Sequence, residues 1–391
     1  MMQKLLLPEV QKFIKDHQRD DPFLLSLHTK MHLGFPLAEA IEQIQSRQKA
    51  HHKLPTWNEH DKIIFPNPIS VEQSSSEITA WYKTSLIHGK SIVDLTGGMG
   101  VDASYFADKF EVVNYVEPEQ KLCELAKHNF NVLNKHIAIH QSTAEQFLET
   151  NLLHYDVLFI DPSRRAEEKK VFRIRDCSPN LYDIMPQCLE AAGQVLLKLS
   201  PLVDVGLLIR DFHPTDIWVV AVKGEVKEVL CLINGTEGRS NIHAVDIFNQ
   251  KEKVTFSFSR KEESDSQNSY ALPKKYLYEP NSAMLKAGAF KLIGKRYKLK
   301  KLHQHTHLYT SNELIYDFPG KIMRVVEILS LGKKETRKAI PGKKINVITR
   351  NFPLSPSQLK KKFDLKDGGE NFLIGATLMN EKKVLLLCDR I

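Results

Sequence analysis

The sequence predicts an α/β fold built on a doubly wound, mostly parallel sheet, with a helical region before it and a small α+β region after it. Three observations predict this class: apolar segments alternate with helical patterns, a glycine-rich turn follows the first of these segments, and the charge changes sign along the chain. The 391 residues are 42% hydrophobic and 26% charged. This composition is typical of globular proteins and excludes a disordered or fibrous chain.

The first 52 residues carry helical patterns. Asp20-Asp21-Pro22 places an acid at a helix cap and a proline in the first turn, and Pro36 precedes apolar residues at helical spacing. Residues 53–72 contain three prolines and predict an extended connector. Ser74-Ser75-Ser76-Glu77 then predicts the start of another helix, because serine hydroxyls can cap the first free N–H groups.

From residue 91 onwards, short apolar segments alternate with helical patterns, as in successive units of strand, helix and parallel strand. The predicted strands cover residues 91–95, 112–116, 138–140, 157–160, 195–199, 217–222 and 226–233. The predicted helices cover residues 101–110, 120–133 and 143–152. Beyond them, residues 254–259 predict an exposed strand, residues 262–269 a polar loop and residues 384–388 a final apolar strand.

The charge is unevenly distributed. Residues 91–240 hold 15 Lys+Arg and 22 Asp+Glu, whereas residues 241–391 hold 29 and 15, in a chain of net charge +8. A basic region beside an acidic core suits a catalytic domain with an anion-binding module, and RNA binds such a surface by releasing counterions. The candidate RNA contacts are Arg165, Lys295, Arg296, Lys298, Lys300, Lys301, Lys343 and Lys344. A lysine-rich surface without a nucleic-acid partner is the alternative.

Several classes of protein are excluded. No stretch approaches about 18 consecutive apolar residues, so no membrane-spanning helix is expected. The first residues lack the layout of a signal peptide. The five cysteines are scattered singly, which argues against a zinc ribbon, an iron–sulfur cluster or a disulfide framework. We therefore expect a cytoplasmic, enzyme-sized protein in reducing surroundings.

The segment with the clearest chemistry joins the first predicted strand to the next helix. Asp94 ends the strand, and Asp102 lies in the first turn of the helix. The turn residues are Thr96, Gly97, Gly98 and Gly100. Glycines let the backbone approach a ligand that side chains would otherwise block. Glu117 ends the second strand, where a carboxylate can accept both hydroxyls of a ribose, so turn and acid together predict a nucleoside-containing cofactor.

The acids beside the turn decide among the nucleoside cofactors. A dinucleotide needs Gly-x-Gly-x-x-Gly to place its pyrophosphate at a helix N-terminus, whereas this turn reads Thr96-x-Gly98-x-Gly100. Asp94 and Asp102 would repel a pyrophosphate but suit a sulfonium and an ammonium group. No P-loop lysine is present, which disfavours ATP hydrolysis. The expected cofactor is therefore S-adenosyl-L-methionine rather than NAD.

The fourth predicted strand leads into Asp161-Pro162-Ser163-Arg164-Arg165. Polar residues at the carboxyl end of a strand in an open α/β sheet lie at the edge where ligands bind. We therefore assign Asp161, Pro162, Ser163 and Arg164 as candidate catalytic residues. Asp161 and the backbone around Pro162 would grip the acceptor group, and the arginines would face a phosphate or a base. A loop with two solvated arginines is the alternative.

These motifs resemble class I S-adenosylmethionine-dependent methyltransferases. More narrowly, the chain is similar to a bacterial family, with several members from Bacteroidetes, of methyltransferases with a THUMP-like C-terminal domain. Thr96 stands where most class I enzymes have their first glycine. Besides the motifs already described, the resemblance includes Lys53-Leu54-Pro55, residues 72–80, Val116-Glu117, Tyr278-Glu279-Pro280 and Cys388-Asp389-Arg390.

The resemblance implies four regions and a set of contacts. The regions are a helical N-terminal region with its connector over residues 1–72, a Rossmann-like core with a seven-stranded sheet over 73–240, a small ferredoxin-like region over 241–325 and a THUMP-like domain over 326–391. The loop 94–100 and Glu117 would hold the cofactor, with its adenine near Ser142, Thr143 and Ala144. Gln73 and Thr79 would close over the methionine end. THUMP domains are associated with RNA modification, which implies a structured RNA, a tRNA or an rRNA, as substrate.

The atom that accepts the methyl group stays open. Relatives that methylate amines follow Asn/Asp-Pro with a second proline and an aromatic residue, whereas Ser163 and Arg164 stand here, which disfavours an exocyclic amine. Methylation at C5 of a pyrimidine needs a cysteine after the fifth strand, where this chain has Leu199-Ser200-Pro201. Covalent C5 chemistry is therefore disfavoured as well.

Three histidines, His303, His305 and His307, alternate, so a single strand would place them on one face. No acid or cysteine accompanies them at ligand spacing, so we expect a solvated strand near a basic surface rather than a metal site.

Two other functions stay open for the chain as a whole. One is a small-molecule or protein methyltransferase with an incidental basic surface, and the other is a non-catalytic RNA-binding protein that retains the cofactor fold.

Overall fold

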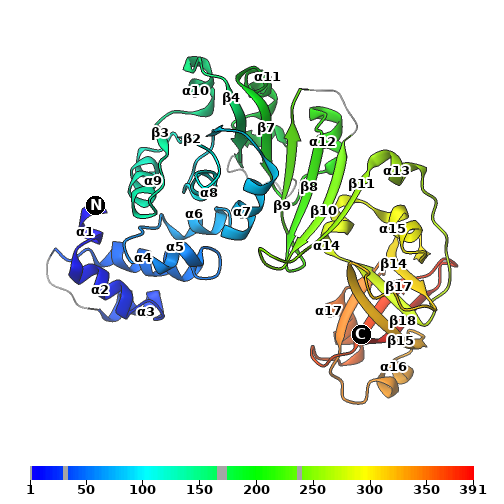
Figure 1. Ribbon diagram of the computed structural model, residues 1–391. Helices are drawn as coiled ribbons and strands as arrows, with labels where there is room; N and C mark the ends of the chain where they lie inside the picture. The colour runs from blue at the N-terminus through cyan, green and yellow to red at the C-terminus, as the bar shows by residue number, and fades with distance from the viewer. Residues whose placement is uncertain (1, 30–33, 165–173, 236–239) are drawn as a thin grey trace. The chain divides into compact units, whose positions relative to one another are not determined.

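The computed structural model describes residues 2–29, 34–164, 174–235 and 240–391, and Figure 1 shows their helices and strands. The chain divides into two compact units. The first comprises Met1–Thr215, Glu228–Gly238 and Asn249–Lys251, and the second comprises Asp216–Lys227, Arg239–Phe248 and Glu252–Ile391. None of the helices in the described ranges has both the length and the apolarity that a bilayer crossing requires.

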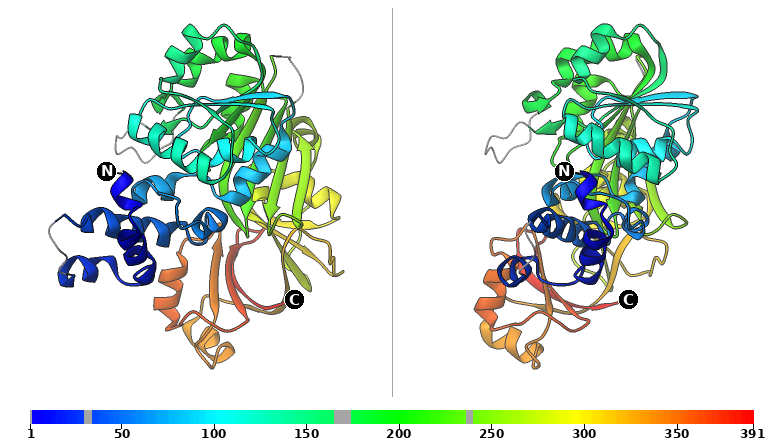
Figure 2. Two further views of the ribbon diagram at one scale, coloured as in Figure 1. Left: turned by 60° about the vertical axis from the view of Figure 1, so that its left-hand side comes forward. Right: turned by 90° about the vertical axis from the view of Figure 1, so that its left-hand side faces the viewer.

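The first unit begins with helices, as the sequence predicts: α1 (Met2–Leu5), α2 (Pro8–Asp16), α3 (Pro22–His28) and α4 (Leu37–Ala50). Asp21 caps α3 by accepting the N–H groups of Phe23 and Leu24 at 2.8 and 3.2 Å, and Pro22 is the first residue of that helix. Buried apolar side chains of α2 and α4 pack into one core cluster. Figures 1 and 2 both show these helices gathered together.

The prediction of an extended connector over residues 53–72 is wrong. Two short helices, α5 (Pro55–Glu59) and α6 (Pro68–Gln73), occupy much of it. In both helices a proline stands at the first position, where its missing N–H is not needed and its fixed φ suits the helix. The serine cap of the next helix, α7 (Glu77–Leu86), is confirmed, because the hydroxyl of Ser76 accepts the N–H of Thr79.

Six described strands form the sheet of the first unit in the order β9-β7-β4-β1-β2-β3. They are β1 (Ser91–Asp94), β2 (Val112–Val116), β3 (Ala138–His140), β4 (Tyr155–Ile160), β7 (Ala192–Leu199) and β9 (Glu225–Ile233). Neighbouring strands are parallel except β9, which runs antiparallel to β7. The predicted α/β class with a mostly parallel sheet is therefore confirmed.

The helices between these strands are α8 (Val101–Phe106), α9 (Gln120–Val132), α10 (Ala144–Thr150), α11 (Leu181–Ala191) and α12 (Val205–Phe212). The sequence patterns predict the first three and miss α11 and α12. After β4, the short strand β5 (Ser163–Arg164) pairs antiparallel with β6 (Cys177–Ser178), which follows the 3-10 helix η1 (Ile174–Asp176).

The second unit begins with three strands. β8 (Asp216–Val222) is parallel to β10 (Asn241–Ile247), and β10 is antiparallel to β11 (Lys253–Ser259). The strands β8 and β11 are predicted, whereas β10 is not. The polar loop predicted over residues 262–269 is wrong in its first part, which belongs to α13 (Arg260–Asp265). Ser259 and Glu262 form a reciprocal capping box that starts this helix.

The rest of the second unit contains a seven-stranded sheet in the order β13-β14-β12-β15-β18-β17-β16. Its strands are β12 (Tyr276–Pro280), β13 (Lys300–His303), β14 (Thr306–Ser311), β15 (Gly320–Leu329), β16 (Asn346–Arg350), β17 (Phe372–Thr377) and β18 (Lys383–Arg390). The accompanying helices are α14 (Ser282–Ala287), α15 (Phe290–Arg296), α16 (Lys333–Ala339) and α17 (Pro356–Phe363). The predicted α+β character is confirmed, while the region boundaries after residues 72, 240 and 325 stay predictions.

Candidate functional site

The turn after β1 requires glycine at two positions for conformational reasons. β1 ends at Asp94, and α8 begins at Val101. Between them Gly98 and Gly100 have φ angles of +53° and +86°, a left-handed conformation that strains residues with a Cβ atom. Gly100 is also the cap from which α8 starts. The two glycines therefore set the direction in which the helix leaves the edge of the sheet.

A third glycine, Gly97, is required for space. A Cβ atom at this position would lie 2.1 Å from a ring carbon of Tyr115. Tyr115 is fully buried in β2, and its hydroxyl donates a 2.6 Å hydrogen bond to the carbonyl of Gly98. The tyrosine therefore both packs against the turn and holds it through a hydrogen bond.

Replacing Gly97 by alanine should destabilise the protein by about 1–3 kcal/mol, because the added methyl group overpacks the contact with Tyr115. Chemical unfolding followed by circular dichroism would measure this loss. Gly193→Ala is the matched control, since a Cβ atom there would lie 3.5 Å from the carbonyl oxygen of Asp156, an ordinary contact. Equal stabilities of the Gly97 variant and the wild type would contradict the packing described here.

Glu117 connects the end of β2 to the same turn. Its Oε2 accepts the N–H of Gly98 at 2.9 Å, and its Oε1 accepts the N–H of Glu119 at 2.9 Å. Burial raises the pKa of Glu117, although both N–H donors oppose the shift. Each carboxylate oxygen has a further lone pair, so the group can also accept hydroxyls from a ligand. The structure thus brings the predicted turn and the predicted acid together.

The segment predicted to lie near an adenine is next to Glu117. The N–H of Ser142 donates to the carbonyl of Glu117 at 3.2 Å. Thr143 caps α10 by accepting the N–H of Gln146, and Ala144 is the buried first residue of that helix. These residues therefore lie beside Glu117 in the candidate site.

Four carboxylates gather around the turn, and we call them the acid cluster: Asp94, Asp102, Glu117 and Asp161. Asp94 is 1% exposed, and its Oδ1 accepts the N–H of Thr96 at 3.0 Å. Burial, and next the carboxylate of Asp102, raise the pKa of Asp94 well above its usual range, and the two other acids add to the effect. A cluster of this kind favours a cationic ligand and disfavours a phosphate.

The segment before α7 reaches the acid cluster through a residue that was not predicted. The hydroxyl of Ser75 donates a 2.6 Å hydrogen bond to Oδ2 of Asp102. The hydroxyl of Thr79 is buried and donates to the carbonyl of Ser76 at 3.0 Å, so it serves the helix cap. Gln73 is exposed at the end of α6. Cofactor contacts from Gln73 and Thr79 stay predictions.

Asp161 follows β4 and is tied to the turn. Its N–H donates to Oγ1 of Thr96 at 2.7 Å, and its carboxylate forms an ion pair with Lys198 in β7. Thr96, at the position where related turns have glycine, thereby connects the first and fourth strands of the core. The predicted catalytic segment thus starts beside the predicted cofactor loop.

The residues after Asp161 lead away from this point. Pro162 is half-buried, and the exposed Ser163 donates to the carbonyl of Ser178 at 3.3 Å. Arg164 has its backbone in β5. Arg165, predicted to contact RNA, lies outside the described residues.

Two lysines beside the acid cluster, the buried Lys83 and the half-buried Lys198, are not predicted from the sequence. Lys83 in α7 is fully buried, and its Nζ lies 3.0 Å from Oε2 of Glu228 and 3.2 Å from Oδ1 of Asp102. Burial lowers the pKa of Lys198, but Asp161, Glu228 and Asp102 outweigh this effect and raise it above the usual range. Two sequence signals could have revealed them, namely a lone charge in the apolar segment 195–199 and a lysine three residues after Ala80 on the apolar face of its helix.

Most of the other predicted RNA contacts are exposed in the second unit: Lys295, Arg296, Lys298, Lys300, Lys343 and Lys344. For Lys301 the prediction is wrong. Its side chain is 2% exposed, and its ammonium donates to the carbonyl of Gln304 at 2.7 Å. Side chains alternate along β13, so Lys300 reaches solvent while Lys301 points inward. Burial lowers the pKa of Lys301 to about 8.

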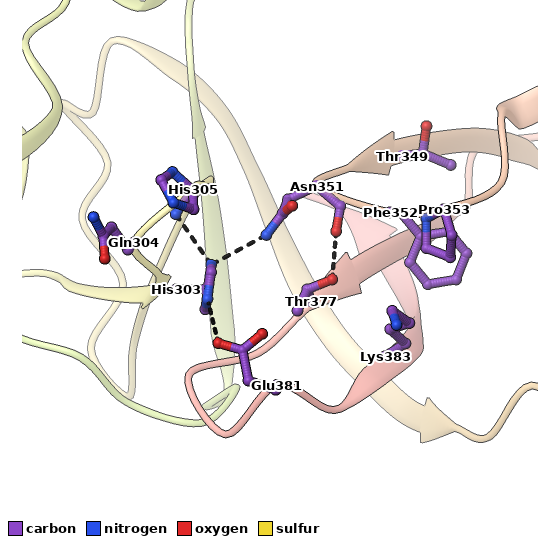
Figure 3. Close-up of a pocket in the computed structure, with 10 residues that line it drawn as sticks. All are labelled: His303, Gln304, His305, Thr349, Asn351, Phe352, Pro353, Thr377, Glu381 and Lys383. Atoms are coloured by element: carbon purple, nitrogen blue, oxygen red, sulfur yellow. Dashed lines mark hydrogen bonds and ion pairs between the residues drawn. The ribbon is translucent and has the colours of Figure 1, made fainter.

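The prediction that three histidines share one strand face is also wrong. His303 ends β13, His305 lies in the turn, and His307 belongs to the returning strand β14. Nδ1 of His303 accepts the N–H of His305 at 3.0 Å and an amide N–H of Asn351 at 3.1 Å, so Nε2 carries the proton and donates to Glu381 at 2.9 Å. These groups line a polar pocket of about 670 Å³, drawn in Figure 3.

The fold and the site together define the class of protein. The mostly parallel sheet has a glycine turn after its first strand and a carboxylate after its second strand. The acid cluster lies beside this turn, at the position where nucleotide-binding proteins have cationic or N–H groups that bind phosphates. This arrangement is that of the class I methyltransferases, with the site at the carboxyl edge of the sheet.

Comparisons with known proteins identify the family. Residues 276–319 match a ferredoxin-like domain, and residues 320–390 match a THUMP-like domain. The crystal structure of a proposed methyltransferase from Porphyromonas gingivalis W83 has 33% identity, covers 98% of this chain and 97% of that one, and has a TM-score of 0.87. A protein of Mycobacterium tuberculosis, named an uncharacterized S-adenosylmethionine-dependent methyltransferase, is 20% identical over 312 residues, 76% of this chain and 80% of that protein.

The chain therefore belongs to the family of the Porphyromonas gingivalis protein, the class I S-adenosylmethionine-dependent methyltransferases with a C-terminal THUMP-like domain. The Mycobacterium tuberculosis relative is named for its dependence on S-adenosylmethionine.

Proposed function

We propose that this chain is an RNA methyltransferase that modifies a structured RNA, a tRNA or an rRNA, held by the basic C-terminal region. The observation that carries the proposal is a THUMP-like segment at residues 320–390, joined to a methyltransferase core and lying within a region of 29 Lys+Arg and 15 Asp+Glu. THUMP domains are associated with RNA modification, and an excess of exposed cations suits a phosphate backbone.

We assign cofactor binding to the turn 94–100, Glu117, Asp102 and residues 143–144. The groups present fit the cofactor: Glu117 offers free lone pairs to ribose hydroxyls, and Asp94 offers negative charge to a sulfonium and an ammonium. The cofactor supplies an electrophilic methyl group. The residues of the chain have to hold the acceptor in line with that group and exclude water, which can contribute roughly 7–11 kcal/mol when positioning is ideal.

Transfer of labelled methyl groups tests the proposal. Purified protein is incubated with methyl-labelled S-adenosylmethionine and total RNA from a strain that lacks the gene, and we expect label in one RNA class. Label in a small molecule or in protein alone would favour the first alternative function. RNA binding without any methyl transfer would favour the non-catalytic alternative.

Charge reversal in the basic region should weaken RNA binding. Lys298→Glu combined with Lys300→Glu should lower affinity and reduce the slope of log K against log[salt] by roughly 2, since each lost phosphate contact contributes about 0.9. Filter binding across a salt series measures both quantities. Lys121→Glu with Lys127→Glu, two exposed lysines of α9, is the matched control and should leave the slope unchanged. Equal slopes for both double variants would contradict the assignment of the surface.

A further inference from the structure

The geometry points to a hydroxyl oxygen as the atom that accepts the methyl group, and within RNA this is the 2′-hydroxyl of a ribose. The inference rests on the proposed RNA methyltransferase function and names the acceptor at that same site. Two lysine–carboxylate pairs carry it: Asp161 with Lys198, and Glu228 with Lys83.

The two pairs form one network with an outer and an inner part. In the outer pair the side chains of Asp161 and Lys198 are 31% and 13% exposed. Asp161 directly follows β4, and Lys198 lies in the neighbouring strand β7. In the inner pair the side chains of Glu228 and Lys83 are 3% and 0% exposed. Attraction from Glu228 also reaches Lys198, which links the two pairs. A substrate can therefore touch the outer pair, while the inner pair holds it in place.

A hydroxyl is a weak nucleophile until its proton is withdrawn. Its methylation therefore needs a proton acceptor and a positive charge beside the developing oxyanion. The carboxylate of Asp161 supplies the first. Lys198 supplies the second, because the surrounding carboxylates keep it in the ammonium form despite its burial. Both groups are already paired and need little rearrangement when the substrate arrives.

The other acceptors are less compatible with these residues. Methylation at a ring carbon needs a thiolate, whereas all five cysteines are buried, and burial raises the pKa of Cys188 to about 12. Attack by an exocyclic amine develops positive charge on its nitrogen, so an adjacent ammonium opposes that reaction instead of assisting it. No aromatic residue follows Asp161 and Pro162 to stack on a base.

In the inferred step the ribose 2′-oxygen attacks the methyl carbon. A carbon–oxygen bond forms, the carbon–sulfur bond breaks with its electron pair remaining on sulfur, and the hydroxyl proton passes to Asp161. The products are a 2′-O-methyl ribose, S-adenosylhomocysteine and a protonated Asp161, which then releases its proton to water.

Alkaline hydrolysis of the labelled RNA tests the inference, because alkali cleaves RNA through the 2′-hydroxyl that this methyl group would block. With the chain of 391 residues and total RNA from the deletion strain, we expect the label in alkali-resistant dinucleotides. Label in the bases of mononucleotides would overturn the inference and leave the proposed function standing. No label in RNA at all would overturn both.

Variants test the role of each pair. Lys198→Met and Asp161→Asn should each lower kcat by about 100-fold without a change in KM, because each removes an interaction that is made only in the transition state. Lys198→Arg, which keeps the cation, should retain more activity than Lys198→Met. Lys135→Met removes another lysine–aspartate pair of the first unit, with Asp108, and should leave kcat unchanged. A wild-type kcat in Lys198→Met would overturn the inference.

A readout that does not depend on activity completes the test. Binding of S-adenosylhomocysteine to each variant, by calorimetry, should match the wild type and so show that the site is folded. NMR titration of lysine side chains should show that Asp161→Asn lowers the pKa of Lys198. An unchanged pKa would contradict the coupling on which the inference depends. Lys83 is a positioning residue, and Lys83→Met should shift the pH profile of kcat.

Discussion

Replacing Glu117 by alanine should weaken binding of S-adenosylhomocysteine by about 100-fold or more. Hydrogen bonds between a carboxylate and two ribose hydroxyls are worth about 1.5–3 kcal/mol each, and 1.4 kcal/mol corresponds to a tenfold change in affinity. The substitution also leaves the N–H groups of Gly98 and Glu119 without their acceptor, so the turn itself loses support. Both effects lower the affinity for S-adenosylhomocysteine.

Isothermal titration measures the change in affinity. Glu111→Ala is the matched control, because this exposed glutamate directly precedes β2 and lies outside the acid cluster. Its affinity should equal that of the wild type. An unchanged affinity in the Glu117 variant would remove the assignment of this residue to the ribose.

Replacing Asp94 by asparagine should have two effects of opposite sign. In the protein without cofactor, Asp94 is a buried carboxylate among other carboxylates, so removal of its charge should raise stability at neutral pH. The same change removes negative charge that attracts the cationic cofactor, so the affinity for S-adenosylmethionine should fall. Thermal unfolding with and without the cofactor would separate these effects.

The pH dependence of stability follows from the direction of the pKa shift. The pKa of Asp94 is higher in the folded than in the unfolded chain, so the folded state binds more protons between the two values. The contribution of this group to stability is therefore greatest below its unfolded pKa of about 3.9 and declines as pH rises through the folded value. The stability advantage of Asp94→Asn should accordingly grow with pH across this window.

Asp156 provides a control, because its pKa is shifted in the opposite direction to that of Asp94. Its Oδ2 accepts the N–H groups of Ser91 and Lys90, and these hydrogen bonds lower the pKa of Asp156. Asp156→Asn should therefore reduce stability at neutral pH without affecting cofactor affinity. A stability loss in Asp94→Asn like that in Asp156→Asn would contradict the prediction that the charge of Asp94 destabilises the folded protein.

Local sequence patterns predict most of the core because its elements are strongly periodic. The strands β2 and β3 have their predicted bounds, since each is a short apolar run between polar segments. The patterns fail where a short polar sequence gains structure from a cap. Pro55 and Pro68 start helices rather than break them, and Ser259 with Glu262 starts α13.

The site was predictable where its residues follow adjacent parallel strands. The turn 94–100 and Glu117 come together because they end adjacent parallel strands. The buried Lys83 was not predictable in the same way, because Lys83 and Glu228 are 145 positions apart and meet only through the order of strands and helices. Lys301 shows the opposite error: a cation inside a basic run was assigned to the surface, whereas strand alternation turns it inward.

The contacts of Lys83 have a consequence for dissecting the protein. This one ammonium is shared by Ser75 before the turn 94–100, Asp102 in α8 just after it, and Glu228 far beyond it along the chain. A truncated chain that began at Ser91 would leave two buried acids without their counterion, a loss of about 3–5 kcal/mol for a broken buried pair. A stable fragment must therefore begin upstream of Ser75, so this segment and α7 are an integral part of the first unit rather than a removable extension.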